Sequence, residues 1–291
     1  MRIAVLSGKG GAGKTLVTVN LAAVAGPSVY VDCDVEEPNG HLYFNPKEKM
    51  IYPISVRIPV VNESRCTACR KCVEFCRFHS LALIEKKIMV FEDICHACGG
   101  CSLVCPTKAI TEREKEIGRL EIGVSGETQV MSGIMNPGQA AGVPIIRGLL
   151  KKIPQNLPVF IDCPPGSACS VMESIKDADY CLLVTEPTIF GLHNLRMVHE
   201  LVMVFGKPHG LLLNKCLDGI NPSEVYAKEQ GIPILGQIPY LQHIGDLHAK
   251  GKILVHEEIR FQELFRDLKE KLSQEVLHET ASNTQWKRRD G

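Results

Sequence analysis

The stretch "RIAVLSGKGGAGKTLVTVNLA", residues 2–22, decides the fold of this 291-residue chain. It opens with a short apolar run, passes through a glycine-rich loop and ends in a segment whose apolar residues have helical spacing. The loop fits the pattern G-x-x-x-x-G-K-[ST], with Gly8 and residues 13–15 at its fixed positions. A strand, this loop and a helix in that order predict a phosphate-binding loop at the carboxyl end of a parallel strand.

The rest of the chain repeats the alternation of strand and helix. Apolar runs rich in Val, Ile and Leu suit strands buried on both faces, and they occur at 2–6, 28–34, 158–163, 180–186, 210–216 and 233–239. Segments with helical spacing lie between most of them, at 15–25, 171–178, 192–205 and 222–230. This alternation predicts an α/β fold with a doubly wound, mostly parallel sheet.

One region interrupts the alternation. Over residues 52–112, short extended pieces surround two cysteine runs. We expect this region to be a small α+β module inserted into a domain formed by residues 1–51 and 113–277. The domain should end in an amphipathic helix over 257–277 that packs on the sheet, and the polar residues 278–291 should form a disordered tail.

Composition limits the compartment and the partners. Lys and Arg number 33, as do Asp and Glu, so no net charge recruits nucleic acid or an anionic membrane. No run approaches the roughly 18 apolar residues of a spanning helix, and the first apolar run is too short for a secretory signal. We therefore expect a cytoplasmic protein with no nucleic-acid partner and no stable membrane insertion. Its 13 cysteines then indicate metal binding rather than disulfides.

The glycine-rich loop carries the chemistry of phosphate binding. Its backbone N–H groups turn inward around the phosphates, Lys14 neutralises the β and γ oxygens, and the Thr15 hydroxyl ligates Mg²⁺. ATP with Mg²⁺ is the expected ligand. The loop residues expected to hold it are Gly8, Gly10, Gly11, Ala12, Gly13, Lys14 and Thr15.

A second lysine, Lys9, makes this loop unusual. "KGGAGKT", residues 9–15, resembles the deviant phosphate loop of the MinD/ParA/Mrp ATPases, which are relatives of the nitrogenase iron protein. The resemblance implies that Lys9 reaches across an ATP-bound homodimer to the partner's nucleotide, where a second cation stabilises transition-state charge. The alternative is a solvated loop lysine.

Four later segments extend the resemblance, namely "VDCD" at 31–34, "VFIDCPPG" at 159–166, "LLLNK" at 211–215 and "QIPY" at 237–240. It implies that Asp34 positions the attacking water and that Asp32 supports the Mg²⁺ shell. It also implies that Asp162 lies near Mg²⁺ and that Gly166 offers an N–H to the γ-phosphate. Asn214 would read the adenine edge and Pro239 would pack the base. The structural alternatives are a helix cap for Asp162 and turn residues for Asn214 and Pro239.

The two cysteine runs have the same spacing. Residues 66–76, "CTACRKCVEFC", and residues 95–105, "CHACGGCSLVC", both read C-x2-C-x2-C-x3-C. This spacing is typical of a bacterial ferredoxin-like module with two [4Fe–4S] clusters, in which the fourth cysteine of each run serves the other cluster. The predicted ligands are Cys66, Cys69, Cys72 and Cys105 for the first cluster, and Cys95, Cys98, Cys101 and Cys76 for the second. Zinc is the alternative, but a tetrahedral site has no use for a triple C-x2-C-x2-C.

Two further cysteines, Cys163 and Cys169, flank "PPGSA". They are either a thiol pair or cluster ligands at a dimer axis, or residues with a packing role only. The C-terminal C-x2-C of Mrp-type carriers is absent from the sequence.

The whole chain resembles the MinD-superfamily ATPases that carry an inserted ferredoxin domain. The resemblance implies an ATPase whose ATP-dependent dimer couples nucleotide state to electron transfer, through the two clusters, to an unknown redox partner. Two other functions remain open. One is an iron–sulfur or metal-cofactor assembly or carrier ATPase, and the other is a MinD-like spatial or assembly switch with redox-sensing clusters.

Overall fold

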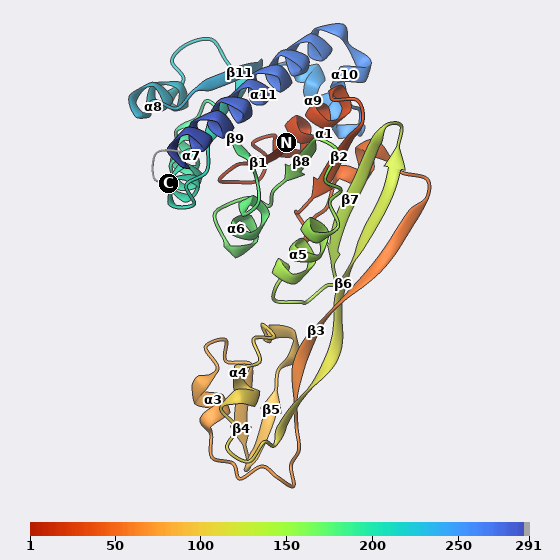
Figure 1. Cartoon of the computed structure of the whole chain (residues 1–291), viewed down its shortest axis with the longest axis vertical. Helices are drawn as coiled ribbons and strands as arrows, with labels where there is room; N and C mark the ends of the chain where they lie inside the picture. The colour runs from red at the N-terminus through yellow and green to blue at the C-terminus, as the bar shows by residue number, and fades with distance from the viewer. Residues whose placement is uncertain (288–291) are drawn as a thin grey trace.

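A nine-stranded sheet organises the protein (Figure 1), whose computed structural model describes the backbone of residues 1–287 and the side chains of residues 1–279. The strand order is β11-β10-β9-β1-β8-β2-β7-β6-β3. Every pair from β11 to β7 is parallel, and the pairs β7–β6 and β6–β3 are antiparallel. The strands are β1 (Arg2–Leu6), β2 (Ser28–Asp32), β3 (Lys49–Val61), β6 (Ile110–Ser125), β7 (Thr128–Met135), β8 (Val159–Asp162), β9 (Tyr180–Thr185), β10 (His209–Cys216) and β11 (Ile234–Pro239).

Helices cover both faces of the sheet, which confirms the doubly wound α/β fold. The first layer holds α5 (Val143–Lys151), α6 (Cys169–Ile175), α7 (Ile189–Val204) and α8 (Pro222–Gln230). The second holds α1 (Lys14–Val24), α2 (Gly40–Phe44), α9 (Gln242–Ala249), α10 (Leu254–Glu257) and α11 (Ile259–Lys287). Each layer buries its own apolar cluster against one face, because strands that are apolar on both sides need both faces covered. No helix in the described part of the chain is long and apolar enough to cross a membrane.

The final helix packs on the sheet as predicted, but it begins and ends later. Phe261, Phe265 and Leu272 are buried in the core, whereas Ile259 is 68% exposed. The helix continues to Lys287, ten residues beyond the predicted end at 277, through part of the segment expected to be a disordered tail. Residues 288–291 of that segment lie outside the described residues.

A long two-stranded ribbon links the sheet to the cysteine-rich segment. β3 and β6 pair from Lys49 opposite Gly123 to Val61 opposite Ile110, and only residues 118–125 of β6 also pair with β7. The remainder of the ribbon extends away from the sheet (Figure 1). Sequence reasoning saw only short extended pieces here. β3 carries apolar residues, and Ile58 is fully buried, but the paired part of β6 is charged over residues 112–116, so no pattern common to both strands marked the ribbon.

The cysteine-rich segment forms a small unit at the far end of the ribbon (Figure 1). Its elements are α3 (Lys71–Phe75), β4 (Leu81–Ile84), β5 (Lys87–Val90), the 3₁₀ turn η1 (Glu92–Ile94) and α4 (Gly100–Leu103). Its buried apolar cluster contains four residues, and two of them are cysteines. So small a core needs further stabilisation, such as bound metal, to hold a unit of this size together.

Candidate nucleotide and cysteine sites

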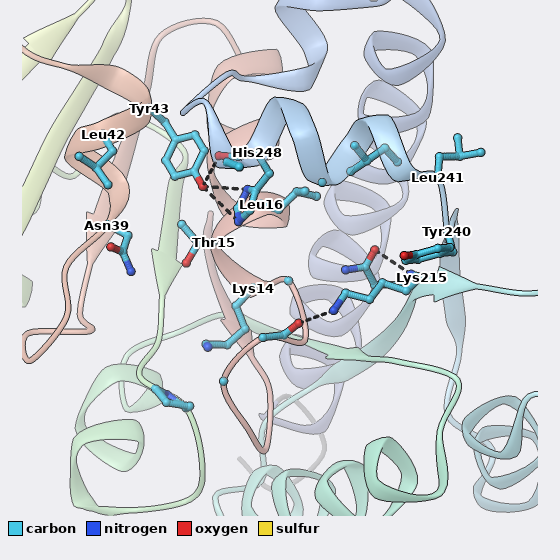
Figure 2. A pocket seen from close by; sticks show the side chains of 18 of the residues that line it. Lys14, Thr15, Leu16, Asn39, Leu42, Tyr43, Lys215, Tyr240, Leu241 and His248 are labelled. Atoms are coloured by element: carbon cyan, nitrogen blue, oxygen red, sulfur yellow. Dashed lines mark hydrogen bonds between the residues drawn. The ribbon is translucent and has the colours of Figure 1, made fainter.

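A cavity of about 630 Å³ lies at the carboxyl edge of the parallel strands, above the start of α1 (Figure 2). The predicted site residues that line it are Gly10, Gly11, Gly13, Lys14, Thr15, Asp34, Asn214 and Pro239. The cavity is also lined by Tyr43, Tyr240 and His248, which sequence reasoning did not single out. The hydroxyl of Tyr43 lies 2.8 Å from Nδ1 of His248 and joins α2 to α9 on one wall.

The loop between β1 and α1 depends on its glycines. Gly13 has φ of 102°, and a Cβ atom there would lie 2.1 Å from Nδ2 of Asn214. A Cβ atom at Gly8 would lie 2.3 Å from the carbonyl oxygen of Asn194. Lys14 is only 7% exposed and makes no ion pair within the described residues. A buried, unpaired ammonium facing a cavity lined by backbone N–H groups suits an anionic ligand.

Two buried carboxylates stand side by side at this edge. Asp32 ends β2, Asp162 ends β8, and the two are direct partners in the parallel register. Burial raises the pKa of both carboxyl groups. The charge of Asp162 raises the pKa of Asp32 further, and both carboxylates raise the pKa of Tyr30. The Lys14 ammonium opposes the rise at Asp162. Their partners differ, so the two acids have different capacities to bind a ligand.

Asp32 is fully engaged by the backbone. Its carboxylate accepts hydrogen bonds from the N–H groups of Asp34 at 3.2 Å, Asn39 at 3.0 Å and Gly40 at 2.8 Å. These bonds fold the loop after β2 and fix the start of α2. The geometry therefore gives Asp32 a loop-supporting role rather than a free ligand oxygen.

Asp162 keeps one oxygen free. Its Oδ2 accepts a hydrogen bond from the Tyr30 hydroxyl at 3.0 Å, while Oδ1 is buried with no hydrogen-bond partner among the described residues. An orphaned buried carboxylate oxygen is costly unless a ligand satisfies it. Mg²⁺ prefers such oxygens, so the arrangement of Asp162 beside the phosphate loop fits a magnesium ion.

Lys9 is paired within its own chain. Its Nζ lies 2.5 Å from Oε1 of Glu186, a residue directly after β9, and Nζ of Lys215 lies 3.7 Å from the other oxygen. Burial acts to raise the pKa of Glu186, but hydrogen bonds from Lys9 and Thr188 hold it below its ordinary value. Sequence reasoning missed Glu186. The available signal was its place at a strand end, which it shares with Asp32 and Asp162.

Gly166 and Asn214 are both occupied in this structure. The N–H of Gly166 donates to the carbonyl oxygen of Ser7 at 3.0 Å. Nδ2 of Asn214 donates to the carbonyl oxygen of Ala12 at 2.8 Å, and its Oδ1 accepts the N–H of Lys215 at 2.9 Å. Asn214 thus supports the phosphate loop from below, although its side chain also reaches the cavity wall.

The eight cysteines of the two runs line two separate hollows. The first hollow is lined by Cys66, Cys69, Cys72 and Cys105, and the second by Cys76, Cys95, Cys98 and Cys101. The fold therefore brings together the two sets that the spacing predicted. No three His, Cys, Asp or Glu side chains of the described chain lie close enough to hold one metal ion.

The two cysteine loops also have similar backbone conformations. Each position in the first run has its equivalent 29 residues later, since 95 minus 66 is 29. Ala68 and Ala97 both have left-handed φ, 55° and 52°, and Arg70 and Gly99 follow with 64° and 73°. Such repeated turns point successive backbone N–H groups to one side, and the Ala97 N–H donates to Sγ of Cys95 at 3.5 Å.

The remaining pair of interest is split between core and surface. Cys163 is fully buried, and burial raises the pKa of its thiol well above the ordinary value. Cys169, at the start of α6, is exposed. The structure thus leaves one accessible thiol here rather than a matched pair.

The fold and the loop define a P-loop nucleotide-binding protein. The chain belongs to the CobQ/CobB/MinD/ParA nucleotide-binding domain family, whose sequence model matches residues 3–255. This is a family of P-loop ATPases, so binding of ATP with Mg²⁺ and ATPase activity in general follow from membership.

Solved structures share the fold of this chain, and some curated sequences are similar to all or part of it. The cell division ATPase MinD of Pyrococcus furiosus is similar with a TM-score of 0.58 and 20% identity, over 94% of this chain and 98% of that chain. MinD of Pyrococcus horikoshii, complexed with Mg-ADP, gives 0.55 and 17%, over 93% and 94%. An uncharacterized protein of Methanocaldococcus jannaschii is 29% identical over 281 residues, covering 94% of this chain and 97% of the relative. Pyruvate synthase subunit PorD of Methanothermobacter marburgensis is 38% identical over 58 residues, which are 20% of this chain and 68% of that subunit.

We predict that Asp34 makes the stability of the metal-free protein fall as the pH rises. Burial raises the pKa of Asp34 to about 6 from 3.8, against the Lys14 ammonium that lowers it. The folded state therefore holds this proton more tightly, and the resulting stability is fully present below about pH 4 and lost as the pH passes through about 6. Asp34→Asn cannot ionise and should lose less stability over this range.

Guanidinium unfolding of both proteins in EDTA, from about pH 4 to about pH 8, measures the effect. The difference between the two curves isolates Asp34, because Asp32 and Asp162 are present in both. Parallel curves would contradict the prediction.

Proposed function

We propose that this protein is an Mg-ATPase whose ATP-bound homodimer couples nucleotide state to electron transfer, through two [4Fe–4S] clusters, to a redox partner. The observation that carries the proposal is the grouping of eight cysteines into two hollows on a ribbon continuous with the nucleotide-binding sheet. The partial similarity to a pyruvate synthase subunit supports it. Two clusters in one small unit suit the passage of single electrons.

The proposed roles at the nucleotide site use the geometry described above. Lys14 and the loop N–H groups would hold the phosphates, while Thr15 and the free oxygen of Asp162 would face Mg²⁺. Asp34 lines the cavity and is half-buried, so it is the candidate to orient the attacking water. Asp32 would act through the loop that it folds.

The other three residues predicted to contact the nucleotide, Gly166, Pro239 and Asn214, now have other neighbours or partners in the structure. Gly166 would reach the γ-phosphate after releasing Ser7, which makes its segment a candidate sensor of nucleotide state. Pro239 lies on the cavity wall beside the exposed Tyr240, and the two would pack the base. Asn214 would contact the adenine edge while retaining its bonds to the loop.

Lys9 is proposed to act in trans. In the single chain it is held by Glu186, and this ion pair must break before Lys9 reaches the nucleotide of a second copy. A partly exposed ion pair is worth little, so a phosphate group of greater charge competes for Lys9 effectively.

An iron–sulfur or metal-cofactor assembly function is the second candidate, favoured by the exposed thiol of Cys169 directly after the segment 164–168. A MinD-like spatial or assembly switch with redox-sensing clusters is the third, favoured by the similarity to MinD over nearly the whole chain.

The iron content tests the cluster proposal. Protein purified without oxygen should hold about eight irons per chain, and Cys66→Ala should hold about four, because each cluster carries four irons on its own ligand set. Cys216→Ala removes a half-buried cysteine outside both hollows, and this variant should keep about eight irons per chain. Stoichiometric zinc in place of iron would end the proposal.

The trans role of Lys9 is tested by a pair of variants. Lys9→Ala should lose ATP-dependent dimerisation and hydrolysis but keep monomer nucleotide binding, because only the contact to the second copy disappears. Light scattering with a non-hydrolysable ATP analogue measures the dimer. Glu186→Gln also breaks the ion pair but keeps Lys9, and it should still dimerise. Equal loss in both variants would show that the ion pair itself, and not the trans contact, is what matters.

Coupling between nucleotide and clusters is tested by a redox titration followed by EPR, with and without Mg-ATP. A shift of about 60 mV corresponds to about 1.4 kcal/mol for a one-electron couple. A shift of that size or larger is expected if ATP binding gates electron transfer. Unchanged potentials would instead favour the assembly or switch functions.

A further inference from the structure

A second cavity, of about 1290 Å³, lies between the nucleotide-binding domain and the cysteine-rich unit. We call it the interdomain chamber. One side is formed by residues 33–37 after β2, by residues 164–165 and 168–170 after β8, and by residues 140–144 leading into α5. The other side is formed by Phe78 and the cysteine loop 96–99, and the ribbon closes the chamber with Val56, Arg57 and Glu112.

The interdomain chamber shares a wall with the nucleotide cavity. Asp34, Glu37 and Pro165 line both spaces. These residues belong to the two segments that follow Asp32 and Asp162, and both segments face the position expected for Mg²⁺ and the γ-phosphate. A change of nucleotide state therefore acts on a surface of the chamber directly.

Only the second set of cysteines reaches the chamber. Cys98 lies on its wall, whereas no cysteine of the first hollow does. Two ion pairs between η1 and β6 hold the second loop in this orientation. Arg113 donates to both carboxylate oxygens of Glu92 at 2.6 Å, and Lys115 donates to Asp93 at 2.7 Å. Asp93 lies two residues before Cys95.

The lining shows which ligands the chamber favours. Asp34, Glu36, Glu37 and Glu112 contribute four carboxylates. Arg57 and Arg147 are the lining arginines, and Arg147 is already bound to Glu173 through bonds of 2.9 and 3.1 Å. The net charge of the walls is thus negative, and negative walls around a water-filled space raise the local concentration of cations.

Two further groups suit a redox ligand. Phe78 and His96 stack with ring centroids 3.7 Å apart at the mouth of the second cysteine loop, and both line the chamber. The exposed thiol of Cys169 lies on the opposite wall. No three metal-ligating side chains of the described residues lie close enough to hold a bare ion, so these walls suit a cationic complex that keeps its own ligands.

We propose that the interdomain chamber is the exit for electrons, where a small metal complex of net positive charge accepts one electron from the second cluster. Cys76, Cys95, Cys98 and Cys101 would hold the cluster that supplies the electron. One electron would pass from that reduced cluster to the complex, with no bond made or broken. The first set of cysteines has no member on the chamber wall, so its cluster would be the entry point. This inference rests on the proposed clusters and specifies the acceptor of the proposed function.

The test uses the full chain with its clusters, reduced by dithionite and oxidised in a stopped-flow instrument. Hexaammineruthenium(III) is the cationic acceptor, and ferricyanide is the anionic one. The variant Glu36→Gln/Glu112→Gln removes two chamber carboxylates, and Glu74→Gln, in α3 of the cysteine-rich unit, removes one exposed carboxylate that does not line the chamber, as the control. The measured quantity is the ratio of the two oxidation rates, because a changed cluster potential shifts both rates in the same direction whereas chamber charge shifts them oppositely.

At low salt the ratio of cationic to anionic rate should fall by about fivefold or more in the double variant and by less than about twofold in Glu74→Gln. The difference should vanish at about 1 M salt. An unchanged ratio in the double variant, or an equal fall in Glu74→Gln, would overturn the chamber as the exit.

A second readout does not depend on electron transfer. Hexaamminecobalt(III), which carries the same charge, should slow alkylation of Cys169 by a maleimide in the parent protein and not in the double variant, as followed by mass spectrometry. Unprotected Cys169 in the parent would overturn cation binding in the chamber. Absence of iron would instead refute the clusters themselves, while the alkylation still reports on the chamber.

Discussion

The parallel pairing of β2 with β8 is the constraint on which the rest of the site depends, because it sets Asp32 opposite Asp162 at one buried edge. Two carboxylates cannot stay ionised so close together in the core without compensation. Asp32 obtains it from three backbone N–H groups, which fold the loop after β2. Asp162 obtains only part of it, from Tyr30 and the charge of Lys14. Its Oδ1 is left with no hydrogen-bond partner among the described residues, which suits a cation beside the phosphate loop.

The same sheet carries the cysteine-rich unit. β2 pairs with β7, β7 with β6, and β6 with β3, so backbone hydrogen bonds run without a break from the strand that ends at Asp32 to the base of the cysteine loops. A ribbon of paired strands transmits displacement better than a flexible linker, because its backbone conformations are already fixed. The ribbon carries the unit away from the sheet (Figure 1), and its residues Val56, Arg57 and Glu112 line the interdomain chamber together with residues of both parts.

Glu186 holds two lysines in the single chain. This carboxylate, directly after the end of β9, pairs with Lys9 and also lies near Lys215, so Lys9 is engaged within its own chain, and its proposed trans role would require that ion pair to break. Lys215 also donates to the Gly11 carbonyl, so Glu186 lies at the centre of a small network that includes the phosphate loop. Lys215 thus connects the phosphate loop at Gly11 to Glu186, the residue that pairs with Lys9.

Periodicity and spacing alone determined the doubly wound sheet, the phosphate loop and the division of eight cysteines into two sets, because each depends on contacts close in sequence or on a fixed spacing. The parallel strands are marked by continuous apolar runs, and the two C-x2-C-x2-C-x3-C runs fold locally. Sequence could not show the ribbon, because apolar β3 pairs with the charged residues 112–116 of β6 across an insertion of about fifty residues. Nor could it show the ion pair of Lys9 with Glu186, whose residues are 177 positions apart. It also could not show that Asn214 is engaged by Ala12, or that Cys163 is buried while Cys169 is exposed. Those features were decided by the tertiary structure, because they arise where segments distant in the chain meet at one edge of the sheet.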